Sequence, residues 1–173
     1  MEIIIIVLGT FLFSTAIFIF SLVKGGINKK YLYTDNLILA SVASAINVLL
    51  FVVINLPLWI FVPFITGFVV LILFILLFLY RFFRNPKRII PGDENDIVSG
   101  ADGRIIYIKE MEVNQTPVSI KKLRIANLNE ITKTNILKQP CYLIGIAMTL
   151  FDVHMNRSPI DGKITLIKHT EGT

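Results

Sequence analysis

Residues 36–80 read NLILASVASAINVLLFVVINLPLWIFVPFITGFVVLILFILLFLY, a run of 45 residues without a charged side chain. A single helix of this length would be about twice as long as the hydrocarbon core of a bilayer is thick. The run must therefore fold back, and Asn55-Leu56-Pro57 is the natural place, because Asn caps helices and Pro stops their propagation. We expect membrane-spanning helices near residues 37–54 and 58–80.

A second uncharged run covers residues 3–23, between Glu2 and Lys24. Its 21 residues suffice to cross a bilayer core of about 30 Å, which predicts a further spanning helix there. A cleaved signal peptide is disfavoured, because no Lys or Arg precedes the run and no small-residue cleavage site follows it. Residues 1–80 are thus expected to form a three-helix membrane anchor.

The composition of the whole chain supports this interpretation. Of its 173 residues, 54% are hydrophobic and only 17% are charged, with a mean hydropathy of +0.72. An ordinary soluble domain is about 25% charged. The net charge of +5 favours an anionic membrane surface as a partner, whereas nothing in the aromatic and basic pattern supports nucleic-acid binding. The single cysteine, Cys141, excludes an intramolecular disulfide.

Basic residues indicate the orientation of the anchor. They lie in the loop after the first predicted helix and just after the last one, and the turn at residues 55–57 has none. The positive-inside rule then predicts a multi-pass protein of the cell membrane with residues 81–173 in the cytoplasm.

The predicted helix at 37–54 also carries features for helix packing. Ala40 with Ser44, and Ser41 with Ala45, form small-xxx-small pairs that permit close contact between helices. Asn47 is expected to hydrogen-bond across such a contact.

Residues 81–173 are predicted to form a small β-rich domain of barrel or sandwich type. Two similar passages, ADGRIIYI at 101–108 and IDGKITLI at 160–167, suggest tight Asp-Gly hairpin turns beside strands. Residues 141–150 read as a buried strand, with a helix as the alternative, and residues 118–128 as a half-exposed strand or hairpin. Residues 127–139 are polar and are expected to form a loop or a short helix.

Residues 151–159, FDVHMNRSP, concentrate the groups that can carry out chemistry. His154 can transfer protons near neutral pH, although a single histidine in a β domain often has only a structural role. On a strand, Asp152, His154 and Asn156 would share one face. Metal binding is weakly supported, because His169 is the only other imidazole and no ligand spacing is present.

Three blocks in this order resemble the phosphatidylserine decarboxylases, above all the short bacterial and archaeal form that includes archaetidylserine decarboxylases. They are RFFRNPKR at 81–88, VSGADGR at 98–104 and FDVHMNRSPIDGK at 151–163. The resemblance implies a pyruvoyl enzyme of phospholipid biosynthesis. In this family the proenzyme cuts itself before a serine of a Gly-Ser-Thr motif, and that serine becomes the pyruvoyl group. The pyruvoyl carbonyl then forms a Schiff base with the serine headgroup of the lipid, CO2 leaves, and ethanolamine remains.

The resemblance also assigns roles to residues. Asp102 corresponds to the acid that assists self-cleavage, and His154 to the imidazole that handles protons during decarboxylation. Asn156 and Arg157 are expected to bind substrate, since a guanidinium suits a phosphate or carboxylate. Some family members have a second histidine where Arg157 stands, and Gly100 replaces a common proline. No metal is implied.

The 173 residues contain no Gly-Ser-Thr. We therefore expect the β-rich domain to be incomplete at its C-terminus, a C-terminal small subunit to supply the pyruvoyl-forming serine, and this chain alone to be inactive. The alternative is a membrane-anchored β domain that binds a partner without catalysis. A cluster of Asp, His, Asn and Arg at residues 152–157 favours the enzyme, because a scaffold has no need of it.

Overall fold

The computed structural model describes residues 1–89, 93, 96–112, 118–121, 124–127, 140–165 and 167. The chain divides into two compact units. The first combines Met1–Pro86 with Thr149–Met155, and the second combines Lys87–Met148 with Asn156–Thr173. The first unit thus includes a short segment from late in the sequence. The predicted domain boundary after residue 80 stays a prediction.

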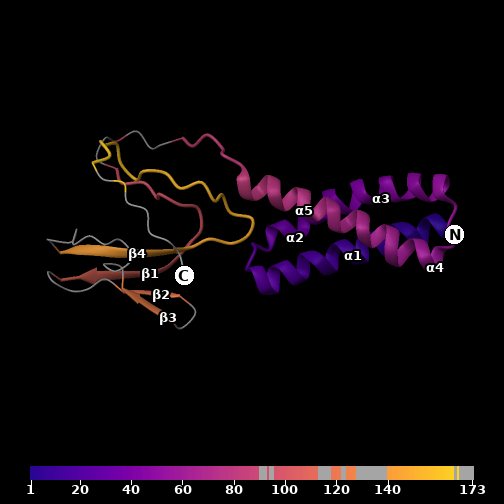
Figure 1. Cartoon of the computed structure of the whole chain (residues 1–173), viewed down its shortest axis with the longest axis horizontal. Coiled ribbons are helices and arrows are strands. Elements are labelled where there is room, and N and C mark those ends of the chain that lie inside the picture. Colours follow the sequence, from indigo (N-terminus) through magenta and orange to yellow (C-terminus); the bar gives the residue numbers. More distant parts are fainter. Residues whose placement is uncertain are drawn as a thin grey trace. The chain divides into compact units, whose positions relative to one another are not determined.

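Three long helical stretches form a bundle in the first unit (Figure 1). They are α1 (Glu2–Gly25), α3 (Asp35–Ile54) with the short α2 (Lys30–Tyr33) before it, and a last stretch of α4 (Leu58–Ile60), the π-helix η1 (Phe61–Thr66) and α5 (Gly67–Phe83). Three stretches, Glu2–Gly25, Lys30–Ile54 and Leu58–Phe83, are long and apolar enough to span a membrane. Helices are thus found at the positions predicted near 3–23, 37–54 and 58–80, and their crossing of a membrane stays a prediction.

The turn between the last two long helices is also confirmed. Asn55 ends α3 in the left-handed conformation, with φ 51°, and its N–H donates to the carbonyl of Phe51. Pro63 lies within η1. Since proline has no N–H for a regular helical bond, the wider π-turns accommodate it without ending the helix.

Polar side chains join α1 and α3 inside the apolar bundle. Asn47 is fully buried and donates from Nδ2 to Thr10 Oγ1 at 3.2 Å, as predicted. Further along, Ser14 donates to Asn36 Oδ1 at 2.5 Å. In helices that span a membrane, hydrogen bonds of this kind strengthen a contact that the hydrophobic effect does not drive.

The small residues of α3 are only partly used in that contact. Ala40 and Ser44 are buried, which fits close packing. Ser41 and Ala45 are exposed, because each lies one residue further round the helix, and the Ser41 hydroxyl donates to the carbonyl of Leu37 instead. Only the first of the two predicted small-residue pairs therefore packs inside the unit.

Two two-stranded antiparallel sheets are described in the second unit (Figure 1). β1 (Arg104–Met111) pairs with β4 (Cys141–Ala147), with a bulge between Ile105 and Tyr107. β2 (Val118–Lys121) pairs with β3 (Arg124–Asn127), which confirms the hairpin predicted at 118–128. The described strands form two two-stranded sheets, so the predicted barrel or sandwich is not confirmed. Residues 128–139, for which a loop or short helix was predicted, lie outside the described residues.

The predicted Asp-Gly hairpin turns are wrong. Asp102-Gly103 precedes β1, whose partner β4 lies far along the chain. Gly103 has φ 143°, and a Cβ there would lie 2.4 Å from the carbonyl oxygen of Ala147. The glycine therefore permits close approach to β4. The second passage forms no strand over its described residues 160–165, and nothing lies within 4 Å of a Cβ at Gly162.

The strand predicted at 141–150 is shorter and less buried than expected. It ends at Ala147, and its side chains range from exposed to half-buried. The residues that follow leave the sheet, and Thr149–Met155 belongs to the helical unit.

Candidate functional site

A turn at residues 149–152 inserts Phe151 into the helix bundle. The side chain is fully buried, and its ring contacts those of Tyr31, Phe18 and Phe74, with centroids 5.1, 6.0 and 6.0 Å away. These three aromatic residues come from α2, α1 and α5. The segment that precedes the candidate histidine is therefore fixed by all the stretches that meet at this end of the bundle.

Asp152 closes the same turn with its backbone N–H and with its side chain. Its backbone N–H donates to the carbonyl of Thr149 at 3.1 Å, and its carboxylate accepts the N–H of Thr149 at 2.7 Å. A carboxylate used in this way stabilises a turn, as Asp side chains commonly do. Asp152 thus sets the direction of the chain that leads to His154.

His154 stacks on Phe82, near the end of α5. The ring centroids are 3.8 Å apart, with 16° between the planes. The backbone N–H of His154 also donates to the backbone carbonyl of Phe82 at 3.4 Å. Nδ1 lies 3.0 Å from the carbonyl oxygen of Asp152. Because a carbonyl can only accept, Nδ1 carries the proton in this bond, and Nε2 of the neutral ring is then a base.

The predicted strand face of Asp152, His154 and Asn156 is wrong. Described residues 151–158 lie in no strand, because the turn at Thr149 ends the extended course of β4. Asp152 instead serves the turn. Asn156 belongs to the second unit, where its side chain is exposed.

In the second unit, two of the sequence blocks run beside each other. The Arg157 N–H donates to the carbonyl of Gly100 at 2.8 Å, and the Val98 N–H donates to the carbonyl of Pro159 at 3.0 Å. A Cβ at position 100 would lie 2.8 Å from the carbonyl oxygen of Arg157, so the close approach favours glycine. The blocks at 98–104 and 151–163 therefore meet through their backbones.

Asp102 is paired with Arg88. The Nη2 group of Arg88 donates to both carboxylate oxygens, at 2.6 Å to Oδ1 and 2.5 Å to Oδ2. Arg88 comes from the block at 81–88, so this ion pair joins the first and second blocks. Both side chains are partly exposed to solvent, at 47% and 34%. The pair leaves the carboxylate oriented and accessible.

Sequence reasoning had not singled out Phe82 or Arg88. Both lie in a block that was noticed, but a phenylalanine at the end of an apolar helix and an arginine in a basic run resemble ordinary anchor residues. Only the long-range contacts, to His154 and to Asp102, distinguish them. The candidate residues fall into two groups, His154 with Phe82 in the first unit and Asp102 with Arg88 in the second.

The family model for phosphatidylserine decarboxylase matches residues 75–173. The chain belongs to this family. The matched range contains all three blocks on which the resemblance was based, so the family prediction is confirmed.

Several decarboxylase proenzymes are similar to this member of the family. An archaetidylserine decarboxylase proenzyme of Methanocaldococcus jannaschii is 40% identical over 99 residues, which are 57% of this chain and 46% of the relative. A phosphatidylserine decarboxylase proenzyme of Carboxydothermus hydrogenoformans is 35% identical over 106 residues, 61% of this chain and 39% of the relative. The chain thus spans less than half the length of these relatives. No solved structure matches it.

Phosphatidylserine decarboxylase proenzymes are pyruvoyl-dependent, and the cofactor arises from their own cleavage. The side chains of His154 and Asp102 suit such chemistry. His154 offers one ring nitrogen as a base while the other is held by a carbonyl, and Asp102 offers an accessible carboxylate.

Proposed function

We propose that this chain is the membrane anchor and N-terminal part of a decarboxylase that acts on lipids with a serine headgroup. The lipid is a phosphatidylserine or an archaetidylserine, and the products are CO2 and the corresponding ethanolamine lipid. The helices hold the protein in the cell membrane as a multi-pass anchor, with residues 81–173 on the cytoplasmic side. One observation carries the proposal, namely that the segment with His154 is seated on the end of an apolar helix bundle.

The position of His154 along the helices supports a lipid headgroup as the substrate. Phe82, its stacking partner, is the next-to-last residue of α5, and the helix ends at Phe83. Lys24 lies in the last turn of α1, and Arg81 in the last turn of α5, so this end of the bundle is basic. In a bilayer these residues would lie at the level of the headgroups. A soluble substrate would not require a histidine at this depth.

Phe151 strengthens the argument about depth. It contacts Phe18, seven residues before the end of α1, and Phe74, nine residues before the end of α5. At 1.5 Å per residue these positions are about 10 and 14 Å inside the helix ends. The segment at residues 149–155 is therefore partly inserted among the helices and is more than a loop that touches them.

His154 is proposed as the proton-transfer group of the reaction. With Nδ1 held by the Asp152 carbonyl, Nε2 can take up a proton and return it to the carbon from which CO2 has left. The stacked ring of Phe82 restricts rotation of the imidazole. Arg157 and Asn156 are proposed to bind the charged groups of the serine headgroup.

Asp102 is proposed to assist self-cleavage of the proenzyme, with Arg88 as the residue that positions its carboxylate. A C-terminal small subunit is proposed as the partner that carries the pyruvoyl-forming serine. When bound, the pyruvoyl group supplies a carbonyl that withdraws electrons from the bond to be broken. An anionic membrane surface is the proposed second partner, and the charge of +5 supports it.

The experiment supplies this chain with the C-terminal part of the Methanocaldococcus relative and reconstitutes it in two sets of vesicles, one with phosphatidylserine and one with archaetidylserine. Formation of the corresponding ethanolamine lipid in either set is measured by lipid chromatography. His154→Ala is expected to reduce the rate by about a hundredfold or more, the usual effect of losing one acid–base group. Met155→Ala, which removes an exposed neighbour, is the control. Full activity of His154→Ala, or no product from a cleaved parent protein, would contradict the proposal.

A further inference from the structure

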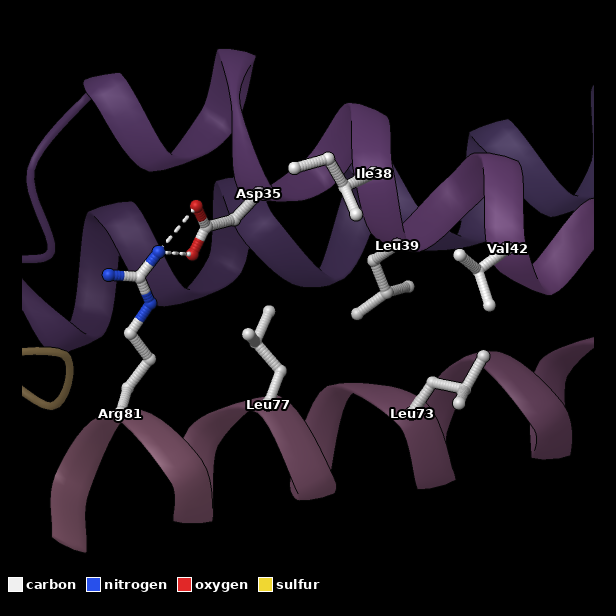
Figure 2. Close-up of a pocket in the computed structure, with 7 residues that line it drawn as sticks. All are labelled: Asp35, Ile38, Leu39, Val42, Leu73, Leu77 and Arg81. Carbon is white, nitrogen blue, oxygen red and sulfur yellow. Dashed lines mark hydrogen bonds and ion pairs between the residues drawn. The ribbon is translucent and has the colours of Figure 1, made fainter. Parts of the chain in front are cut away.

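A narrow groove lies between α3 and α5 (Figure 2). Its volume is about 220 Å³. Figure 2 shows side chains from the two helices pointing toward one another across it. The apolar lining residues are Ile38, Leu39, Val42, Leu73 and Leu77. Ile38 and Val42 are 65% and 49% exposed, so the groove opens on the outer surface of the bundle.

One end of the groove is charged. Arg81 Nη2 lies 2.7 and 2.6 Å from the two carboxylate oxygens of Asp35, whose side chain is only 6% exposed. The guanidinium also lies 4.8 Å above the ring of Tyr31. Ionisable side chains in membrane helices are costly and commonly mark a functional site. Here they stand where the apolar lining stops, at the basic end of the bundle.

The dimensions of the groove suit a single hydrocarbon chain. From Leu73 to Arg81 the helix rises eight residues, or about 12 Å, and one leaflet of a bilayer core is about 15 Å thick. The groove is also smaller than the roughly 300–1,000 Å³ of pockets that enclose a whole drug-sized ligand. A second helix, about 10 Å wide, would not enter it.

The charged end specifies what such a chain is attached to. The ion pair with Asp35 uses Nη2 of Arg81, and a guanidinium has further donors on Nη1. Arginine favours phosphate because its planar fork matches the phosphate oxygens. A phospholipid aligned with the bilayer brings its phosphate to the level of the helix end and its chain along the apolar lining.

We propose that the groove between α3 and α5 binds one hydrocarbon chain of a membrane phospholipid, with the lipid phosphate beside Arg81. The inference rests on the proposed position of the helices in a membrane. It does not rest on the decarboxylation, because a non-substrate phospholipid would bind in the same way.

The test uses the full chain in vesicles of phosphatidylethanolamine and phosphatidylglycerol. The probe is a phosphatidylglycerol with a photoactivatable diazirine midway along one chain, which lacks an amine and is not a decarboxylation substrate. After irradiation, mass spectrometry locates the label. We expect it to concentrate on the groove residues Leu73 and Leu77. Labelling spread evenly over all exposed helix faces would overturn the inference.

Val42→Trp fills the groove, whereas Leu71→Trp places the same side chain on the opposite face of α5 and is the matched control. Val42→Trp is expected to reduce label on Leu73 and Leu77 by about tenfold or more, a loss of about 1.4 kcal/mol in binding. Leu71→Trp should leave it nearly unchanged. If Val42→Trp lowers helicity by circular dichroism, Val42→Phe, a smaller change at the same position, is used in its place. Unaltered labelling in a folded groove variant would overturn the inference.

A second pair of probes tests the phosphate. The double variant Asp35→Asn with Arg81→Gln removes both charges and avoids an unpaired buried carboxylate. It should reduce labelling by the phospholipid but not by a diazirine hydrocarbon without phosphate. Equal labelling by the phospholipid in parent and variant would overturn the role of Arg81.

A carbonate wash separates this inference from the proposed function. If the chain leaves the vesicles, the membrane position fails, and the groove inference fails with it. If the chain remains but the label is even, only the groove inference fails.

Discussion

Phe151→Ala is the substitution that most directly tests the seating of the candidate histidine. The ring is fully buried against Tyr31, Phe18 and Phe74. Removing a buried phenylalanine costs about 3–5 kcal/mol. The lower end applies here, because an undocked Phe151 would still lie near the membrane surface and keep part of its transfer free energy. Docking of residues 149–155 is thus expected to weaken by about 3 kcal/mol.

Amide hydrogen exchange measures this loss directly. The His154 N–H is bonded to the Phe82 carbonyl only while the segment is docked. A change of about 3 kcal/mol corresponds to roughly 100-fold faster exchange, because 1.4 kcal/mol is about tenfold. The full chain is examined in nanodiscs, with Met155→Ala as the control, since Met155 is in the same segment but 46% exposed. The control should exchange at the parent rate.

The same variant predicts a functional loss when the chain is supplied with a C-terminal part. Undocking separates His154 from Phe82, so decarboxylation should fall together with protection of the His154 amide. Unchanged exchange at His154 in Phe151→Ala would refute the docking argument. Phe151→Leu restores an apolar side chain at this position. If it restores exchange protection of the His154 amide relative to Phe151→Ala but not the activity, the link between docking and catalysis is refuted.

Three further predictions concern the ring stacked on His154, the Asp102–Arg88 pair and the orientation of the helices. Phe82→Leu should lower decarboxylation by about tenfold at most, because an aromatic pair contributes about 0.5–1.5 kcal/mol, and kinetics in vesicles would show a change in kcat; normal kcat would contradict it. Asp102→Asn should leave the proenzyme uncut on a denaturing gel, and a cleaved Asp102→Asn chain would refute the role of Asp102. Arg88→Ala should change the unfolding free energy by less than about 1 kcal/mol, because the Arg88–Asp102 pair is partly exposed. Reporter fusions at residues 30 and 90 should report the cytoplasm and one at residue 55 the exterior, and an external signal at residue 90 would contradict the orientation.

The helices could be predicted from sequence because the physical constraint is strong. A long uncharged run is stable in hydrocarbon only as a helix, and its length limits how often it could cross a bilayer. Asn55 and the proline after it marked the turn, and Asn47 marked a contact between helices. These are local signals, each with one stable structural outcome.

The β-rich part was predicted less well because its pairing is not local. β1 pairs with β4 across the intervening residues 112–140, and no pattern in either strand indicates which strand it pairs with. Asp-Gly was misread for a specific reason. Glycine serves tight turns and also permits close approach of two backbones, and Gly103 has the second role beside Ala147.

The residues of the candidate site stay a prediction, whereas their predicted arrangement on one strand face is wrong. The block at 151–159 lies within the range that the family model matches. Its first residue, Phe151, continues the apolar pattern of β4, so the sequence gives no sign that it leaves the sheet for the helices. An aromatic side chain that packs among helices distant in the sequence looks locally like any other strand residue.

These contacts bear on what the anchor is for. A helix bundle that only anchors a chain needs no aromatic side chains that converge on a segment from late in the sequence. Here Phe18, Tyr31 and Phe74 converge on Phe151, and Phe82 stacks on His154. The bundle therefore positions the candidate histidine as well as holding the chain. For the proposed reaction on a lipid headgroup this would be a physical advantage, because helices that set the depth of the protein in a bilayer would also set the depth of the proposed proton-transfer group.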